Sequence, residues 1–123
     1  MASQKTILVT GAAGGIGRAF VELALVDGAR LILVDRDAAA LSRLENEIGK
    51  TAGASCVVSD LASFEACRKI THGVERLDAV VHLAGVYIDD DASEEFKDVW
   101  DTTIAANLTA VFNLTSVFAP LLC

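Results

Sequence analysis

A glycine-rich segment, TGAAGGIG at residues 10–17, follows the apolar run TILV at 6–9 and could hold a phosphate group. Its four glycines lack a Cβ atom, so the backbone can turn sharply and come close to a ligand. If a helix begins in this segment, its free N–H groups and the positive end of its dipole point at the same place, which suits a pyrophosphate. Close packing of the helix on the strand is the alternative use of the glycines.

A carboxylate ends the second apolar run, RLILVD at 30–35. Asp35 is in position to accept hydrogen bonds from the ribose hydroxyls of an adenosine, and its charge would repel a 2′-phosphate. We therefore predict NAD as the cofactor in preference to NADP. Arg36 follows directly and softens this preference, because its guanidinium offers a partner to a 2′-phosphate. The alternative for Asp35 is a solvated carboxylate at the end of a strand.

Short apolar runs with strand character alternate along the chain with longer helical patterns. Strands that are apolar on both faces and separated by helices indicate a parallel sheet covered on both sides. Right-handed crossovers then predict a doubly wound α/β fold of about four strands in the order 3-2-1-4. The predicted strands are 6–9, 30–35, 54–59 and 77–85, and the predicted helices are 15–28, 38–49, 63–73 and 93–122, the last in one or two segments.

Composition narrows the classes of partner. The net charge of −7 and the scattered basic residues argue against nucleic acid as the main partner, because phosphate neutralisation needs clustered Lys and Arg. The three cysteines have no C-x-x-C spacing, so we expect neither a disulfide framework nor a metal site, and a reducing cytoplasm is the natural compartment. The amino-terminal residues do not resemble a signal peptide.

The stretch 102–123 carries no charged residue and is long enough to raise the question of a membrane span. Asn and Thr recur through it, and such polar groups are costly in lipid. We therefore predict a helix buried against protein and no membrane association. A membrane-anchored protein remains the alternative.

Together these features resemble the short-chain dehydrogenase/reductase family, whose Thr-Gly-x-x-x-Gly-x-Gly spacing fits residues 10–17. The resemblance covers essentially all of residues 1–123 and implies a single, partial NAD(P)-binding domain of Rossmann-like fold. It also implies that the pair after the third strand contacts adenine and that HLAG at 82–85 replaces the family's Asn-Asn-Ala-Gly. The cofactor-binding residues so implied are Gly11, Ala13, Gly14, Gly15, Ile16, Gly17, Asp35, Arg36, Asp60, Leu61, His82, Ala84 and Gly85.

Asn107 matches the family's helical active-site Asn and is the one catalytic residue that the resemblance implies in this chain. The family's chemistry also needs a Ser and a Tyr with a Lys four residues later. The chain's single Tyr, Tyr87, is not followed by such a Lys, and we expect it to be an apolar anchor of its loop. The resemblance therefore implies the cofactor-binding part of an oxidoreductase that interconverts an alcohol and a carbonyl by hydride transfer. We expect this part, truncated before the fifth strand, to be inactive alone.

Two other functions stay open. A His-x-Ala segment and the Gly-x-x-Gly-x-x-Gly that is readable at 11–17 resemble the family's epimerase-like branch, so an epimerase or dehydratase is one alternative. A non-catalytic nucleotide-binding module is another. His82 itself is more commonly a satisfied histidine at a strand end than a ligand. Without a fifth strand, the strand at 77–83 would have an open edge and the apolar helix would lose cover, which predicts a homo-oligomer.

Overall fold

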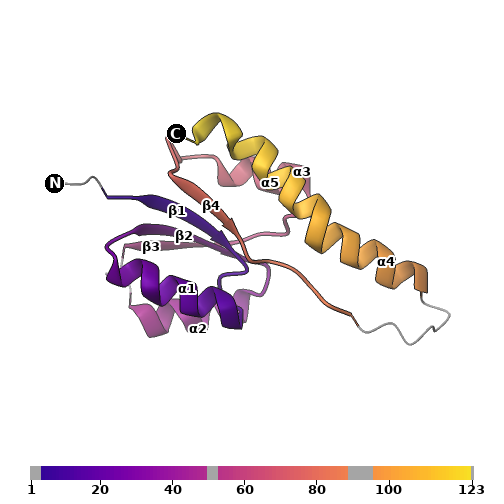
Figure 1. Ribbon diagram of the computed structural model, residues 1–123, viewed down its shortest axis with the longest axis horizontal. Coiled ribbons are helices and arrows are strands. Elements are labelled where there is room, and N and C mark those ends of the chain that lie inside the picture. The colour runs from indigo at the N-terminus through magenta and orange to yellow at the C-terminus, as the bar shows by residue number, and fades with distance from the viewer. Residues whose placement is uncertain (1–3, 50–52, 89–95, 123) are drawn as a thin grey trace.

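The computed structural model describes residues 4–49, 53–88 and 96–122, which form a sheet with helices on both faces (Figure 1). The described elements are, in chain order, β1 (Thr6–Thr10), α1 (Gly15–Val26), β2 (Arg30–Asp35), α2 (Ala38–Ile48), β3 (Ala54–Val58), α3 (Phe64–Ile70), β4 (Ala79–His82), α4 (Phe96–Ile104), the π-helical turn η1 (Ala105–Thr109), α5 (Ala110–Phe118) and the 3-10 turn η2 (Ala119–Leu121).

The four strands are parallel and follow the order β3-β2-β1-β4, so the predicted fold class and strand order are confirmed. In the register of the sheet, Leu8 of β1 lies between Ile32 of β2 and Val80 of β4. The carboxyl ends of all four strands therefore meet at one edge of the sheet, where the loops that leave β1, β2, β3 and β4 come together. This is the edge at which open α/β sheets bind their ligands.

Two apolar cores lie on opposite faces of the sheet, because successive side chains of a strand point to opposite sides. Val9 and Leu33 face α1 and α2 and belong to one buried cluster. Leu8 and Val34 belong to the other, which includes Phe118 of α5 and residues of α3. The runs of consecutive apolar residues in β1 and β2 follow from this two-sided cover.

Local signals set the helix ends. The Asp37 side chain accepts a hydrogen bond from the Ala40 N–H at 3.0 Å, and Ser63 accepts one from the Ala66 N–H at 3.2 Å. Each oxygen satisfies an N–H group in the first turn that has no partner inside the helix. After α1, Gly28 has a φ of +83°, a conformation that favours glycine and turns the chain towards β2.

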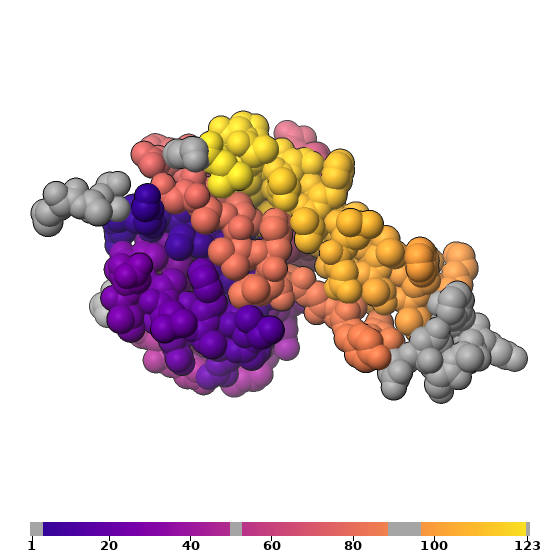
Figure 2. Space-filling view, in the orientation of Figure 1, coloured from indigo at the N-terminus to yellow at the C-terminus, as the bar shows by residue number. Residues whose placement is uncertain are grey.

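The carboxyl-terminal helical segment is continuous from Lys97 to Leu121, and Figure 2 shows α4 projecting beyond the body formed by the sheet and the other helices. With a mean hydropathy of 1.5 it is long and apolar enough to cross a membrane, a test that core helices of soluble proteins also pass. Leu114 and Phe118 are buried under the sheet, whereas Leu108 and Phe112 are exposed. The helix thus has one covered side and one uncovered side. The stretch VYIDDDA at 86–92, which the sequence predicts to be an acidic loop, lies partly outside the described residues.

Candidate dinucleotide-binding site

A cleft of about 370 Å³ opens at the carboxyl ends of the strands. The loops after β1, β2, β3 and β4 and one side of α4, η1 and α5 form its walls. It is lined by Gly11, Gly14, Val34, Asp35, Arg36, Ser59, Asp60, Leu61, Ala62, Leu83, Ala84, Gly85, Val86, Thr102, Ala105, Ala106 and Ala110. Five separate stretches of sequence therefore converge on one small volume.

The glycines of the first loop divide into two kinds. Gly11 has a φ of +62°, and a Cβ atom there would lie 2.6 Å from the Ala84 N atom. A Cβ atom at Gly17 would lie 2.2 Å from the Gly11 O atom. Close packing therefore accounts for these two. A Cβ atom at Gly15 would meet no atom within 4 Å, and one at Gly14 would only touch the Gly11 O atom at 3.4 Å. Packing therefore does not explain why Gly14 and Gly15 are glycines. The space beside them is open, and a ligand could come close to the backbone there.

Asp35 joins the second strand to this loop. Its Oδ2 accepts a hydrogen bond from the Ala13 N–H at 3.1 Å, and its Oδ1 accepts one from the Asp37 N–H at 3.0 Å. These two bonds fix the carboxylate at the cleft while leaving further acceptor positions on both oxygens, since an ionised carboxylate has about four. Arg36 lines the same cleft next to it.

Thr10 is a site residue that sequence reasoning missed. The residue is 1% exposed, and its hydroxyl accepts hydrogen bonds from the Leu83 N–H at 3.2 Å and the Ala84 N–H at 3.1 Å. The hydroxyl thereby holds the loop after β4 against the end of β1 and places Ala84 over Gly11. A polar residue at the end of an otherwise apolar strand was the available signal.

Asn107 lies in the π-helical turn between α4 and α5. Its Oδ1 accepts a hydrogen bond from the Val86 N–H at 2.7 Å, and its Nδ2 donates one to the Val86 O atom at 2.9 Å. A Cβ atom at Gly85 would lie 2.8 Å from the Asn107 Oδ1 atom, so the glycine makes room for this contact. Single π-helical turns are frequent at functional sites. Here the turn contains Asn107, which holds the loop after β4 in place.

The loop after β3 is held from the opposite side. Asn113 of α5 is 6% exposed and its Nδ2 donates hydrogen bonds to the Leu61 O atom at 3.0 Å and the Ala62 O atom at 3.2 Å. Asp60 is oriented by the Ala62 N–H, which donates to its Oδ1 at 3.0 Å. In the described part of the chain, the buried Ser59 Oγ atom has no hydrogen-bond partner. Sequence reasoning passed over Asn113, although an amide inside a chargeless helix was a visible signal.

The predicted cofactor residues fall into two groups in the structure. Gly11, Gly14, Asp35, Arg36, Asp60, Leu61, Ala84 and Gly85 line the cleft. The other five do not: Ala13 is in the loop after β1, Gly15, Ile16 and Gly17 are the first three residues of α1, and His82 faces α5. Ile16 is 74% exposed.

His82 contacts Thr115, with 3.1 Å between its Nε2 atom and the Thr115 Oγ1 atom. Burial against α5 lowers the pKa of His82, because the charged imidazolium loses solvation there. The His82 side chain therefore points from β4 towards α5 and lies outside the cleft. The expectation that Tyr87 anchors its loop was wrong, since this side chain is 90% exposed.

The comparison with known families agrees with this geometry. The sequence model described as short chain dehydrogenase matches residues 5–123. The chain belongs to that family. Its members are NAD(P)-dependent dehydrogenases and reductases that act on alcohols and carbonyl compounds.

Relatives of this chain include two curated enzymes. D-threitol dehydrogenase of Mycolicibacterium smegmatis is 37% identical over 113 residues, which cover 88% of this chain and 44% of that protein. L-xylulose reductase of Bos taurus is 36% identical over 112 residues, 91% of this chain and 45% of the relative. A crystal structure described as glucose/ribitol dehydrogenase from Brucella melitensis superposes with a TM-score of 0.88 at 32% identity, covering 96% of this chain and 52% of that one. The chain thus spans about half the length of these relatives.

Proposed function

We propose that residues 1–123 form one partial Rossmann domain that binds NAD as the cofactor-binding part of an oxidoreductase. The Asp35 carboxylate carries this proposal, because it is fixed in the cleft by the Ala13 and Asp37 N–H groups and still has acceptor positions for ribose hydroxyls. A 2′-phosphate in the same place would meet a negative charge. Arg36 is the neighbouring group that moderates this preference.

The remaining residues of the cleft fit the other parts of a dinucleotide. The backbone at Gly14 and Gly15, at the start of α1, is open to a pyrophosphate. Asp60 and Leu61 form a wall for the adenine. Ala84 and Gly85 line the cleft between the first loop and Asn107. When bound, the nicotinamide supplies hydride transfer between an alcohol carbon and a carbonyl.

Binding measured by calorimetry with NAD and with NADP tests the cofactor proposal. We expect NAD to bind at least tenfold more tightly than NADP. Asp35→Asn should weaken NAD binding by roughly 10- to 150-fold, since a hydrogen bond to a charged group contributes about 1.5–3 kcal/mol. Asp27→Asn is the matched control, because this carboxylate lies at the far end of α1. Tighter binding of NADP, or equal losses in both variants, would contradict the proposal.

The reaction that we propose for the whole enzyme is alcohol–carbonyl interconversion. The relatives named above are dehydrogenases and reductases, which favours this reaction over an epimerase, a dehydratase or a module that only binds nucleotide. Within residues 1–123 there is no Tyr followed four residues later by Lys, so we expect these residues alone to give no turnover. Absorbance at 340 nm with threitol, galactitol and xylulose as trial substrates checks this, and a cofactor-dependent rate would overturn it.

We also infer a homo-oligomer, in the cytoplasm, built on the uncovered side of the carboxyl-terminal helix. Trp100, Leu108 and Phe112 are each more than 60% exposed along that side. Clustered apolar exposure of this kind marks interaction surfaces. Light scattering should give a mass above that of one chain. Phe112→Asp should lower this mass. Thr109→Asp, which replaces a less apolar side chain with the same charge, should lower it less. A monomeric mass for the unaltered chain would refute the inference.

A further inference from the structure

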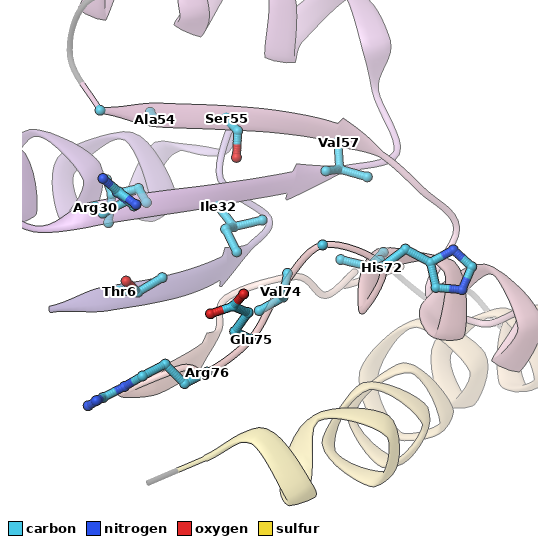
Figure 3. Close-up of a pocket in the computed structure, with 14 residues that line it drawn as sticks. Thr6, Arg30, Ile32, Ala54, Ser55, Val57, His72, Val74, Glu75 and Arg76 are labelled. Atoms are coloured by element: carbon cyan, nitrogen blue, oxygen red, sulfur yellow. The ribbon is translucent and has the colours of Figure 1, made fainter.

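The helix α3 is too short to cover the strand that precedes it. Its seven residues extend about 10 Å, whereas the five residues of β3 extend about 16 Å. The amino-terminal part of the sheet is therefore bare on this face. A cavity of about 790 Å³ lies there, at the end of the strands opposite the dinucleotide cleft (Figure 3).

The strand β3 forms an edge of the described sheet. The Leu31 N–H donates to the Gly53 O atom at 3.0 Å and the Ser59 N–H donates to the Asp35 O atom at 3.1 Å. Because a strand points its backbone groups alternately to its two sides, the N–H and C=O groups of Ala54, Cys56 and Val58 point away from β2. Residues 53–59 contain no charge and no proline, the features that usually protect an edge from pairing.

The edge opens directly onto the cavity. Ser55 and Val57 point from β3 into it, Ile32 points into it from β2, and Val74 closes it from the loop before β4 (Figure 3). Ser55 is small and exposed, so a longer side chain entering from the edge has a free path over it. The floor behind Ser55 is apolar.

Arg30 supplies a positive charge on the side of the cavity that is next to β3. It lies on β2, next to β3, is exposed, and has no ion pair within residues 4–49, 53–88 and 96–122. Glu75 lies beside Thr6 of β1, one strand further away, and Arg76 points away from both towards Asp78, with which it forms an ion pair at 3.2 Å (Figure 3). A group that enters over Ser55 therefore meets the Arg30 guanidinium first.

We propose that the β3 edge binds an extended peptide segment of another protein as an added strand, with an acidic side chain of the peptide on Arg30 and an apolar one on Val57 and Ile32. The backbone groups of Ala54, Cys56 and Val58 supply main-chain hydrogen bonds, and the cavity selects the side chains at alternate positions. The Arg30 guanidinium, which has no ion pair in the described residues, favours an acidic side chain at that position of the peptide.

A second copy of this chain fits the edge less well. An antiparallel pair of β3 strands centred on Cys56 would bring together the two Glu45 side chains, each of which lies beside its own Cys56. Like charges placed together disfavour such a pair. The edge thus excludes its own copy while remaining open to a peptide without an acidic group on that face.

Fluorescence anisotropy with two labelled peptides, TVTETVT and TVTKTVT, tests the proposal on the 123-residue chain. Both peptides place their apolar and charged side chains on one face and threonines on the other. We expect saturable binding of TVTETVT at micromolar to submillimolar concentration and at least tenfold weaker binding of TVTKTVT. Arg30→Glu should reverse this preference, and Arg43→Glu, an equal charge change on the exposed side of α2, should leave it unchanged.

Cys56→Pro removes the outward N–H without removing a hydrogen bond to β2, so both peptides should lose binding. Ser55→Trp fills the path to the cavity and should weaken TVTETVT at least tenfold, which keeps the test available if the proline variant does not fold. No saturation by 1 mM peptide, equal binding to the Arg30→Glu variant, or a dimer whose mass falls in the Cys56→Pro variant would each overturn the proposal.

Discussion

Replacing Gly17 by alanine tests the packing of the glycine-rich loop most directly. Gly17 is the third residue of α1, and alanine in a helix is ordinarily favoured over glycine by about 1 kcal/mol. The added Cβ atom, however, would lie 2.2 Å from the Gly11 O atom and 2.8 Å from the Ala12 O atom. Both are backbone atoms, so the first loop must move by roughly an ångström, and overpacking of this kind costs about 1–3 kcal/mol.

Because both close contacts are with backbone atoms, we take the upper part of that range, about 2–3 kcal/mol, and subtract about 1 kcal/mol for the helix preference of alanine. The expected net effect is a loss of about 1–2 kcal/mol in the free energy of unfolding, seen as a urea midpoint lowered by about 0.5–1 M. Gly15→Ala is the matched control. It is the same change two residues earlier in the same helix, and its Cβ atom meets nothing within 4 Å. This variant should be as stable as the unaltered chain or slightly more stable. If Gly17→Ala is as stable as Gly15→Ala, then the close approach of α1 to the first loop does not require glycine at position 17.

Three further outcomes follow from individual contacts. Burial lowers the pKa of His82, so as the pH falls the unfolded chain takes up a proton before the folded chain does, and the free energy of unfolding should fall below about pH 6.5. In urea titrations at pH 7.5 and 5.5, His82→Gln should remove most of this pH dependence. An unchanged difference between the two pH values would contradict the prediction. Asn107→Ala loses both bonds to Val86, so thermal denaturation should show a loss of about 1–3 kcal/mol, or about 0.5–1.5 kcal/mol for each bond, whereas the exposed Asn46→Ala should change little. Burial, and then Glu45, raise the pKa of the Cys56 thiol from 9.0 to about 11, so iodoacetamide at pH 8 should alkylate it about 100-fold more slowly than an unperturbed thiol; comparable rates would refute the shift.

The sequence was informative where local chemistry decides the structure. The strands β1 and β2 were predicted from their apolar runs, and the structure confirms them. The cap at Ser63 and the turn at Gly28 likewise use residue types that favour these positions. The fourth strand was predicted at 77–85 but is paired only over Ala79–His82, because the loop after it is held by the Thr10 hydroxyl instead of by a neighbouring strand.

Contacts between distant segments were the part that could not be predicted. Nothing in the residues near Asn113 shows that its amide reaches the carbonyl groups after β3, 51 and 52 positions away. The orientation of His82 towards Thr115 depends in the same way on how α5 crosses β4. Tyr87 was expected to be an apolar anchor of its loop, but it is 90% exposed, because its exposure depends on how the loop after β4 lies on the rest of the structure.

The π-helical turn at Ala105–Thr109 places one extra residue in the helix without changing which side of α4 faces the cleft. A π-helical turn holds one residue more than the α-helical turn that it replaces, so the extra residue is absorbed within the turn. Thr102 therefore still lines the cleft from α4 while α5 stays on the sheet. In a regular α-helix each residue advances the rotation by about 100°, so one residue added within α4 itself would turn the residues before it away from the ligand by about that angle.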